Sequence, residues 1–324
     1  MKINNNSSIL ITGGTGSFGK NFVHQLLKRY PKIRRLVIFS RDEFKQYEMS
    51  KMFSQKKYPG IRFFLGDIRD YQRLKTSFRN IDIVVHAAAL KQVDTAEYNP
   101  IEFVNTNIIG AKNIIMAAMD EQVKKVVALS TDKAVSPVNL YGATKLCSDK
   151  LFLAANNYVG KKNCKFSIVR YGNVIGSRGS VLKVFMDNKD KGYFPITDKD
   201  MTRFFLDISI GIKAVNYTIN NMLGGEVVIP KVPSIRIVDL AKAINPKNKL
   251  KLIGIREGEK IHEDMITSAD NRNCYENKDY LFLINLNDNY KKLIKNYNLK
   301  KTKKGFIYNS KTNIKFLKIQ EIKS

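Results

Sequence analysis

A glycine-rich segment near the N-terminus constrains the fold of this chain more than any other feature. Gly13, Gly16 and Gly19 follow the apolar run Ser8–Thr12 and precede a helical pattern over residues 21–27. Glycines at this spacing allow a tight turn, a close approach of the backbone to a pyrophosphate and packing of the helix on the strand. The segment therefore predicts the first strand and helix of a dinucleotide-binding sheet.

Short apolar runs rich in β-branched residues alternate with amphipathic stretches through the first half of the chain. This rhythm predicts an α/β fold with a doubly wound parallel sheet, the Rossmann topology. We expect a dinucleotide-binding domain over residues 1–170, a mainly substrate-binding α/β part over 171–285 and a variable tail over 286–324. The candidate buried strands are Ser8–Thr12, Arg35–Phe39, Arg62–Leu65, Ile83–His86, Lys125–Leu129 and Phe166–Val169.

The chain is strongly basic, with 56 Lys and Arg residues against 29 Asp and Glu residues and a formal net charge of +27. These lysines are spread along the sequence, without an arginine-rich run or an aromatic-basic RNA signature. We therefore expect no nucleic-acid partner, although a basic cleft would suit a diphosphate substrate.

Cysteines, histidines and apolar runs exclude several other classes. No apolar run approaches the ~20 residues of a membrane helix, and residues 1–8 lack a signal-peptide pattern, so we expect a cytoplasmic protein without membrane contact. We expect no metal, because neither the cysteines nor the histidines have the spacing of metal ligands. The residues concerned are Cys147, Cys164, Cys274, His24, His86 and His262.

The end of the second candidate strand bears on the choice of cofactor. Ser40 and Arg41 stand where an acidic residue would bind the ribose 2′-hydroxyl of NAD. A guanidinium binds a 2′-phosphate well, so we expect NADP, while Asp42 keeps NAD open. The expected cofactor contacts are Gly13, Thr15, Gly16, Ser17, Phe18, Gly19, Ser40, Arg41, Asp42, Lys45, Asp67, Ile68, Ala87, Ala88, Lys91, Asn107, Tyr141, Lys145 and Val174.

Tyr141 and Lys145 lie four residues apart and so share one face of a helix. A tyrosine pKa of about 10 falls by three units only with ~4 kcal/mol of phenolate stabilisation, and a neighbouring ammonium has the right sign. The pair follows the fifth strand and Thr131, whose hydroxyl can hold a reacting oxygen. This is the Ser/Thr, Tyr and Lys arrangement of short-chain dehydrogenases.

Residues 129–134 and 139–146 resemble the inverting UDP-N-acetylglucosamine 4,6-dehydratases of pseudaminic acid synthesis, and the resemblance covers about residues 8–265. It implies that Asp132 is the acid for the C6 hydroxyl and Lys133 the base for C5, with a pKa lowered by burial beside Lys145. Retaining dehydratases carry glutamate in place of Lys133, so lysine favours inversion. A retaining dehydratase, a 4-epimerase and a non-enzymatic NADP-binding module remain alternatives.

The resemblance also implies UDP-GlcNAc as substrate, a homo-oligomer with a hexamer expected, and a place in flagellin or surface glycosylation. Arginines fit its diphosphate because their planar donors match phosphate oxygens. Asp94 and Glu257 depart from the family pattern, in which proline stands at both positions. The substrate contacts that it implies are Lys91, Asn173, Arg178, Thr197, Arg203 and Arg256.

Overall fold

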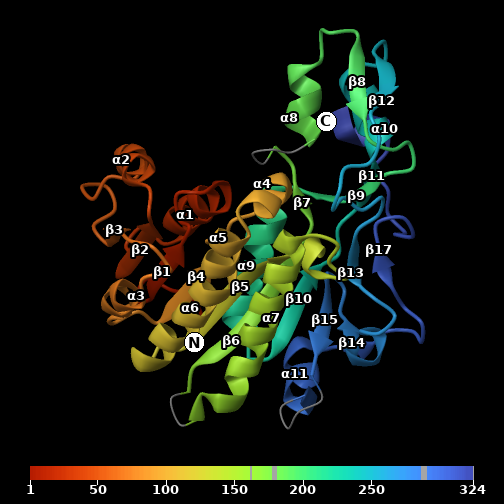
Figure 1. The fold of residues 1–324 in the computed structure, drawn as a ribbon. Coiled ribbons are helices and arrows are strands. Elements are labelled where there is room, and N and C mark those ends of the chain that lie inside the picture. Colours follow the sequence, from red (N-terminus) through yellow and green to blue (C-terminus); the bar gives the residue numbers. More distant parts are fainter. Residues whose placement is uncertain (161–162, 177–180, 286–289, 324) are drawn as a thin grey trace.

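A ten-stranded sheet forms the centre of the protein in the computed structural model, which describes residues 1–160, 163–176, 181–285 and 290–323 (Figure 1). Its strand order is β16-β14-β15-β10-β6-β5-β4-β1-β2-β3, parallel from β10 to β3 and antiparallel beyond β10. The expected α/β class and doubly wound sheet are confirmed. The strands are β1 (Ser8–Thr12), β2 (Arg35–Ser40), β3 (Ile61–Leu65), β4 (Ile83–His86), β5 (Lys125–Thr131), β6 (Lys165–Tyr171), β10 (Glu226–Pro230), β14 (Cys274–Glu276), β15 (Tyr280–Ile284) and β16 (Lys300–Lys301).

Helices cover both faces of this sheet, because alternate residues of each strand point to opposite sides. Leu10 of β1 belongs to a core shared with α3, α6 and α7, whereas Ile9 and Ile11 belong to a core shared with α1 and α9. The helices of this layer are α1 (Ser17–Arg29), α2 (Glu43–Met52), α3 (Tyr71–Phe78), α4 (Val93–Tyr98), α5 (Pro100–Phe103), α6 (Gly110–Asp120), α7 (Leu140–Tyr158) and α9 (Ile208–Asn221), with a π-helical segment η1 (Val104–Ile109) before α6.

The observed strand β5 is two residues longer than the apolar pattern predicts. Its last residues, up to Thr131, still pair with β6, where Thr131 lies opposite Tyr171. The pattern stops at Leu129 because Ser130 and Thr131 are polar, although both continue the strand. This extension places the residues after β5 at the carboxyl edge of the sheet.

A smaller group of elements stands beside the carboxyl edge of the main sheet, at the top of Figure 1. Its core contains Phe185, Phe194, Ile235 and Leu240. The elements of this region are β7 (Asn173–Val174), α8 (Val181–Asp187), β8 (Tyr193–Ile196), β9 (Thr202–Leu206), β11 (Ser234–Arg236), α10 (Ile237–Ile244), β12 (Lys249–Leu252) and α12 (Ile319–Lys323).

The chain crosses between the two regions more often than the expected division suggests. Strands β10, β14 and β15 from residues 171–285, and β16 from the expected tail, all belong to the main sheet. The tail also supplies α11 (Tyr290–Tyr297) and β17 (Tyr308–Asn309), and β17 pairs with β13 (Asp264–Ile266). Boundaries at residues 170 and 285 therefore stay a prediction. None of the described helices is both long and apolar enough to cross a bilayer.

The docking of the tail can be tested at Tyr308. Its hydroxyl accepts a hydrogen bond from Val232 N at 2.8 Å and donates one to Val232 O at 2.9 Å, both in the interior. We expect Tyr308→Phe to lower the free energy of unfolding by about 1–3 kcal/mol, because both backbone groups lose a buried partner. Urea denaturation measures this. Tyr98→Phe, at a tyrosine that is 88% exposed, is the matched control, and equal effects of the two changes would contradict the docking.

Candidate active site

A cavity of about 690 Å³ lies where the parallel strands end, between the main sheet and the smaller region. It brings three sets of predicted residues together: the glycine-rich segment, the catalytic set and most of the substrate set. A single cavity that joins these sets is large enough to hold a dinucleotide end and a sugar side by side. The predicted residues that line it are Gly13, Gly16, Ser17, Phe18, Gly19, Ala87, Ala88, Lys91, Thr131, Asp132, Lys133, Tyr141, Lys145, Asn173, Val174, Thr197, Arg203 and Arg256.

The glycine-rich end of the cavity fits a pyrophosphate. Gly13 has φ +63°, and a Cβ added there would lie 2.8 Å from the backbone N and Cα of Ala88, so only glycine allows this approach. No side chain of the described residues caps the N-terminus of α1, where Gly16 is the N-cap residue. The first N–H groups of this helix are therefore available to an anion.

The expected 2′-phosphate contacts lie next to this segment but outside the lining of the cavity. Thr15 Oγ1 is 3.0 Å from Ser40 Oγ. Arg41 Nη1 lies 3.8 Å from Asp67 Oδ2, and the Arg41 side chain is 55% exposed. Ile68 is buried in the core under β3 and α6.

Asp42 and Lys45 are paired with each other. The Asp42 carboxylate caps α2 by accepting a hydrogen bond from Lys45 N at 2.9 Å, and it forms an ion pair with Lys45 Nζ. The position of this carboxylate is thus explained by helix capping.

Asn107 has a positioning role instead of a place in the lining of the cavity. Its side chain exchanges two 2.9 Å hydrogen bonds with the backbone of Leu90 and donates one to Thr144 Oγ1 at 3.0 Å. It therefore holds the loop before Lys91 against α7.

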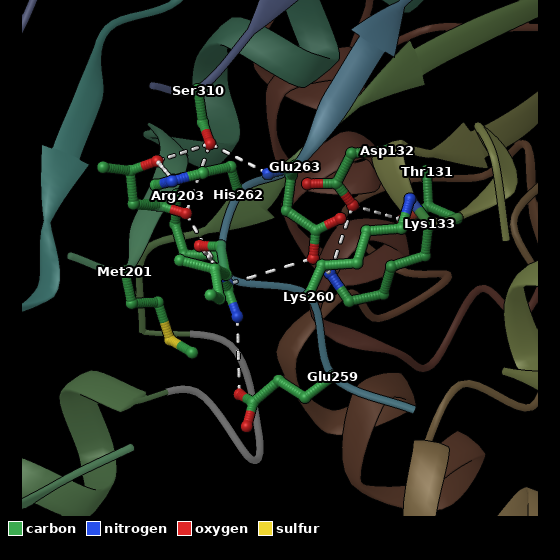
Figure 2. Close-up of polar contacts among 12 residues, drawn as sticks. Thr131, Asp132, Lys133, Met201, Arg203, Glu259, Lys260, His262, Glu263 and Ser310 are labelled. Atoms are coloured by element: carbon green, nitrogen blue, oxygen red, sulfur yellow. Dashed lines mark hydrogen bonds and ion pairs between the residues drawn. The ribbon is translucent and has the colours of Figure 1, made fainter. Parts of the chain in front are cut away.

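The residues after β5 form the centre of the site (Figure 2). Lys133 Nζ lies 3.2 Å from Asp132 Oδ1 and 3.1 Å from Glu263 Oε1. Thr131 Oγ1 donates a hydrogen bond to Asp132 Oδ1 at 3.0 Å. The sequence predicted Thr131, Asp132 and Lys133 together, and the structure adds Glu263 to them.

The electrostatics of Lys133 differ from the expected ones. Burial lowers the pKa of Lys133, but the carboxylates of Asp132 and Glu263 raise it by more, so the net shift is upward. The expected lowered pKa was wrong, because the sequence did not reveal that Lys133 lies between two carboxylates.

Tyr141 and Lys145 share one face of α7, as their spacing predicts, and both line the cavity. Burial raises the pKa of Tyr141 to about 12, while the Lys133 ammonium and a hydrogen bond with Thr131 act to lower it. The expected lowering was wrong for this structure. Lys145 Nζ donates to Leu129 O at 2.9 Å, and burial lowers its own pKa.

A buried layer supports these residues from behind. Ser130 Oγ donates to Asp149 Oδ2 at 2.6 Å, and Arg170 Nη2 lies 3.3 Å from the same oxygen. Thr12 Oγ1 is 2.8 Å from His86 Nδ1, and burial followed by the Lys145 charge lowers the His86 pKa to about 3. Ser130 and His86 also line the cavity, where the Ser130 hydroxyl is bonded to Asp149 and His86 is neutral.

The predicted substrate residues surround the outer half of the cavity. Arg203, 8% exposed, donates to Ile261 O at 2.9 Å and lies 3.4 Å from Glu259 Oε1. Arg256 lies 3.3 Å from the same oxygen and 3.7 Å from Asp94 Oδ2. Asp94, where the family has proline, is thus an ion-pair partner of Arg256.

Three of the four remaining predicted substrate contacts line the cavity, and the fourth lies outside the described residues. Lys91, Asn173 and Thr197 line the cavity, and Asn173 Oδ1 is buried without a hydrogen-bond partner among the described residues. Arg178 lies outside the described residues.

Sequence reasoning missed Glu259 and Glu263 as site residues. Both belong to the stretch 254–263 that carries part of the family resemblance, which was a usable signal.

A family profile described as "Polysaccharide biosynthesis protein" matches residues 9–285. The chain belongs to this family. A Campylobacter jejuni serotype O:2 protein named "UDP-N-acetylglucosamine 4,6-dehydratase (inverting)" is 53% identical over 278 residues, 85% of this chain and 82% of that protein. A serotype O:23/36 protein of the same name is 48% identical over 98% of this chain and 96% of that protein. The resemblance is confirmed.

Other relatives of this chain carry a different name. A Rickettsia akari protein named "UDP-glucose 4-epimerase" is 40% identical over 81% of this chain and 78% of its own length.

Solved structures support the same fold. Pen from Bacillus thuringiensis has a TM-score of 0.89 and 35% identity, and the match covers 100% of this chain and 97% of that one. DesIV, a dTDP-glucose 4,6-dehydratase from Streptomyces venezuelae solved with NAD and TYD bound, has a TM-score of 0.70 and 23% identity, over 78% and 86% of the two chains. This chain thus has the fold of the extended short-chain dehydrogenases.

A comparison of two alanine variants separates the close backbone approach at Gly13 from the strain that a positive φ causes in any residue other than glycine. Gly305 has φ +77° with nothing within 4 Å of an added Cβ, so Gly305→Ala meets strain alone. We expect Gly305→Ala to cost about 1 kcal/mol of unfolding free energy, and Gly13→Ala about 2 kcal/mol more, because its Cβ also collides with backbone. Urea denaturation compares the two. Equal losses would mean that the close approach at Gly13 is not required.

Proposed function

We propose that this protein is an inverting UDP-N-acetylglucosamine 4,6-dehydratase. Its product would be UDP-2-acetamido-2,6-dideoxy-β-L-arabino-hex-4-ulose. The observation that carries the proposal is the presence in one cavity of Tyr141 and Lys145 together with the dyad of Asp132 and Lys133. The first pair suits oxidation at C4, and the dyad suits the removal of water across C5 and C6.

The proposed reaction uses these side chains in order. As a phenolate, Tyr141 Oη takes the proton of the C4 hydroxyl, and the nearby Lys133 ammonium favours this phenolate because it acts to lower the Tyr141 pKa. The resulting C4 ketone makes the C5 hydrogen acidic. Lys133 Nζ, after giving up its own proton, removes that hydrogen as a proton while protonated Asp132 donates a proton to the departing C6 hydroxyl. A proton is finally added at C5.

A nicotinamide dinucleotide, when bound, supplies the acceptor of the C4 hydride and its return to C6. The residues that would hold it are the glycine-rich segment at the start of α1, Ala87, Ala88 and Lys145. We propose NADP as the form used, because Ser40 and Arg41 stand where the 2′-phosphate would lie and Arg41 is half exposed.

The identity of residue 133 separates this proposal from its nearest alternatives. A retaining dehydratase would carry glutamate there, and a 4-epimerase would need neither the C5 base nor the C6 acid. The ion pair of Lys133 with the buried Asp132 favours the inverting dehydratase over both. Because some relatives are named UDP-glucose 4-epimerase, a 4-epimerase activity is the second candidate function.

The wider setting belongs to the same proposal. We place the UDP diphosphate near Arg203 and Arg256, with Lys91, Asn173 and Thr197 around the sugar. We further propose a cytoplasmic homo-oligomer, with a hexamer expected, that acts in pseudaminic acid synthesis for flagellin or surface glycosylation. The proposed substrate-binding part is residues 171–285.

Proton NMR in heavy water tests the reaction directly. Purified protein incubated with UDP-GlcNAc should give a 6-deoxy-4-keto sugar with deuterium at C5 and the couplings of an inverted centre. The uninverted keto sugar would instead identify a retaining enzyme. Unchanged substrate in the presence of NADP would contradict the proposal and return attention to another nucleotide sugar or to a non-enzymatic module.

Two variants test the assignment of roles. Lys133→Met should abolish C5 exchange while NADP still binds, because the base is lost and the dinucleotide end is intact. Tyr141→Phe should stop oxidation at C4, so neither reduced cofactor nor C5 exchange appears. Exchange at wild-type rates in both variants would show that the roles are wrongly assigned.

The cofactor preference can be tested at Arg41. We expect Arg41→Ala to weaken NADP binding by about tenfold to a hundredfold, because one charge-assisted contact to the 2′-phosphate is lost, and to leave NAD binding unchanged. Fluorescence titration measures both affinities. Arg29→Ala, at the far end of α1, is the control. Equal weakening of NAD and NADP by Arg41→Ala would rule out a 2′-phosphate contact.

A further inference from the structure

The Glu263 side chain enters the catalytic cluster from the loop before β13 (Figure 2). Only 3% of the side chain is exposed, and Oε1 lies 3.1 Å from Lys133 Nζ and 3.9 Å from Arg203 Nε. The second oxygen, Oε2, is buried without a hydrogen-bond partner among the described residues. The reaction proposed above gives this carboxylate no task, although a buried carboxylate is costly to maintain.

The backbone at Glu263 is fixed by the tail. Glu263 N donates to Ser310 Oγ at 2.9 Å, and Ser310 N donates to Glu263 O at 2.8 Å. Ser310 Oγ is in turn 2.7 Å from Thr202 Oγ1 of β9. These bonds tie the residue before β13 to the residue after β17 and to β9, which are distant in the sequence. They fix the backbone from which the Glu263 side chain reaches Lys133.

The proposed reaction requires a neutral Lys133, because an ammonium has no lone pair with which to take the C5 proton. The ion-pair partners of Lys133 Nζ are Asp132 and Glu263. Asp132 must itself carry a proton to act as the acid for the C6 hydroxyl, and its Oδ1 already accepts a hydrogen bond from Thr131. Glu263 is therefore the partner that remains to receive the Lys133 proton.

We infer that Glu263 positions Lys133 and accepts its proton, which leaves the neutral amine that acts on C5. In this step an Nζ–H bond breaks and an Oε1–H bond forms, so an ion pair becomes a neutral pair without change of net charge. Nζ then takes the C5 proton. The later addition of one proton to C5 restores the ion pair of Lys133 and Glu263. The inference rests on the proposed dehydratase function.

The surroundings of the pair are compatible with this exchange. The other charged or titratable groups that face it are Asp132 before Lys133, Tyr141 of α7 and Arg203 of β9. Burial raises the pKa of Glu263, the Lys133 charge opposes this, Asp132 adds to it, and the net shift is upward. A carboxyl in such a place takes up a proton more readily than one in water.

The test is the rate at which the enzyme exchanges the C5 hydrogen of the isolated 4-keto product for deuterium, measured as a function of pH, because this exchange does not require oxidation at C4 by Tyr141. In the wild type the proton moves within the pair, so the rate should be flat between about pH 7 and pH 9. In Glu263→Gln the lysine must release its proton to solvent, so the rate should rise about tenfold per pH unit over this range. At about pH 7 the variant should be about 100-fold slower than wild type.

Two further variants separate this role from a loss of packing. Glu263→Asp keeps a carboxylate and should be slower than wild type with a flat profile. Glu226→Gln removes another buried carboxylate, which accepts a hydrogen bond from the Tyr297 hydroxyl at 2.9 Å and does not line the cavity among the described residues. It should keep the flat profile. Thermal unfolding of each variant is measured in parallel.

The outcomes are distinct. A Glu263→Gln enzyme with a flat profile would overturn the inference, whatever its rate. A wild-type rate that already rises tenfold per pH unit would also overturn it, and this result does not depend on how any variant folds. Absence of C5 exchange in the wild type would instead contradict the proposed function.

Discussion

The position of the half-buried Lys133 between two carboxylates is the interaction on which the rest of the site depends. Asp132 and Glu263 lie on either side of its ammonium, and Arg203 balances the second negative charge. Ions removed from water are tolerated only when they are paired with good geometry, and removal of one partner from such a group costs about 3–5 kcal/mol. The cluster therefore requires that its four side chains arrive together.

The fold meets this requirement by bringing separate segments to one edge of the sheet. Asp132 and Lys133 follow β5, Arg203 lies on β9, and Glu263 comes from the loop before β13. Gly172, just after β6, contributes by having no side chain, since a Cβ there would lie 2.9 Å from Asp132 Oδ2. Asp132 and Lys133 lie at the common edge where the parallel strands β5 and β6 end. Arg203 and Glu263 reach this edge from β9 and from the loop before β13, strands that belong to separate small sheets.

The parts that the sequence predicted are those encoded within short stretches. The glycine-rich segment, β1 and β4 were predicted residue for residue, and the spacing of Tyr141 and Lys145 gave a shared helix face. Glu263 and the direction of the Lys133 pKa were not predictable in this way. They depend on contacts between segments far apart in the chain, and no local pattern specifies which loop returns to which strand.

The role of the tail was likewise invisible in its composition, which is dense in lysine and asparagine. Its strand β16 extends the main sheet, and Tyr308 binds the backbone of Val232. The described part of the tail contributes a few buried side chains, Leu293 and Tyr297 among them, between partly and fully exposed residues. The composition of the tail is dominated by exposed lysine and asparagine, so it does not reveal the few side chains that pack in the interior.

The pairing of β13 with β17 also sets the order in which the enzyme can be assembled. Chains emerge from the ribosome from the N-terminus onward, and N-terminal units fold first. The first strand and helix, with the dinucleotide cradle, can form early. The backbone of Glu263 is fixed only after Ser310 has been synthesised and has folded back. A nascent chain would thus form the glycine-rich turn before Glu263 is fixed, and the proposed site would be complete only when synthesis has passed this point.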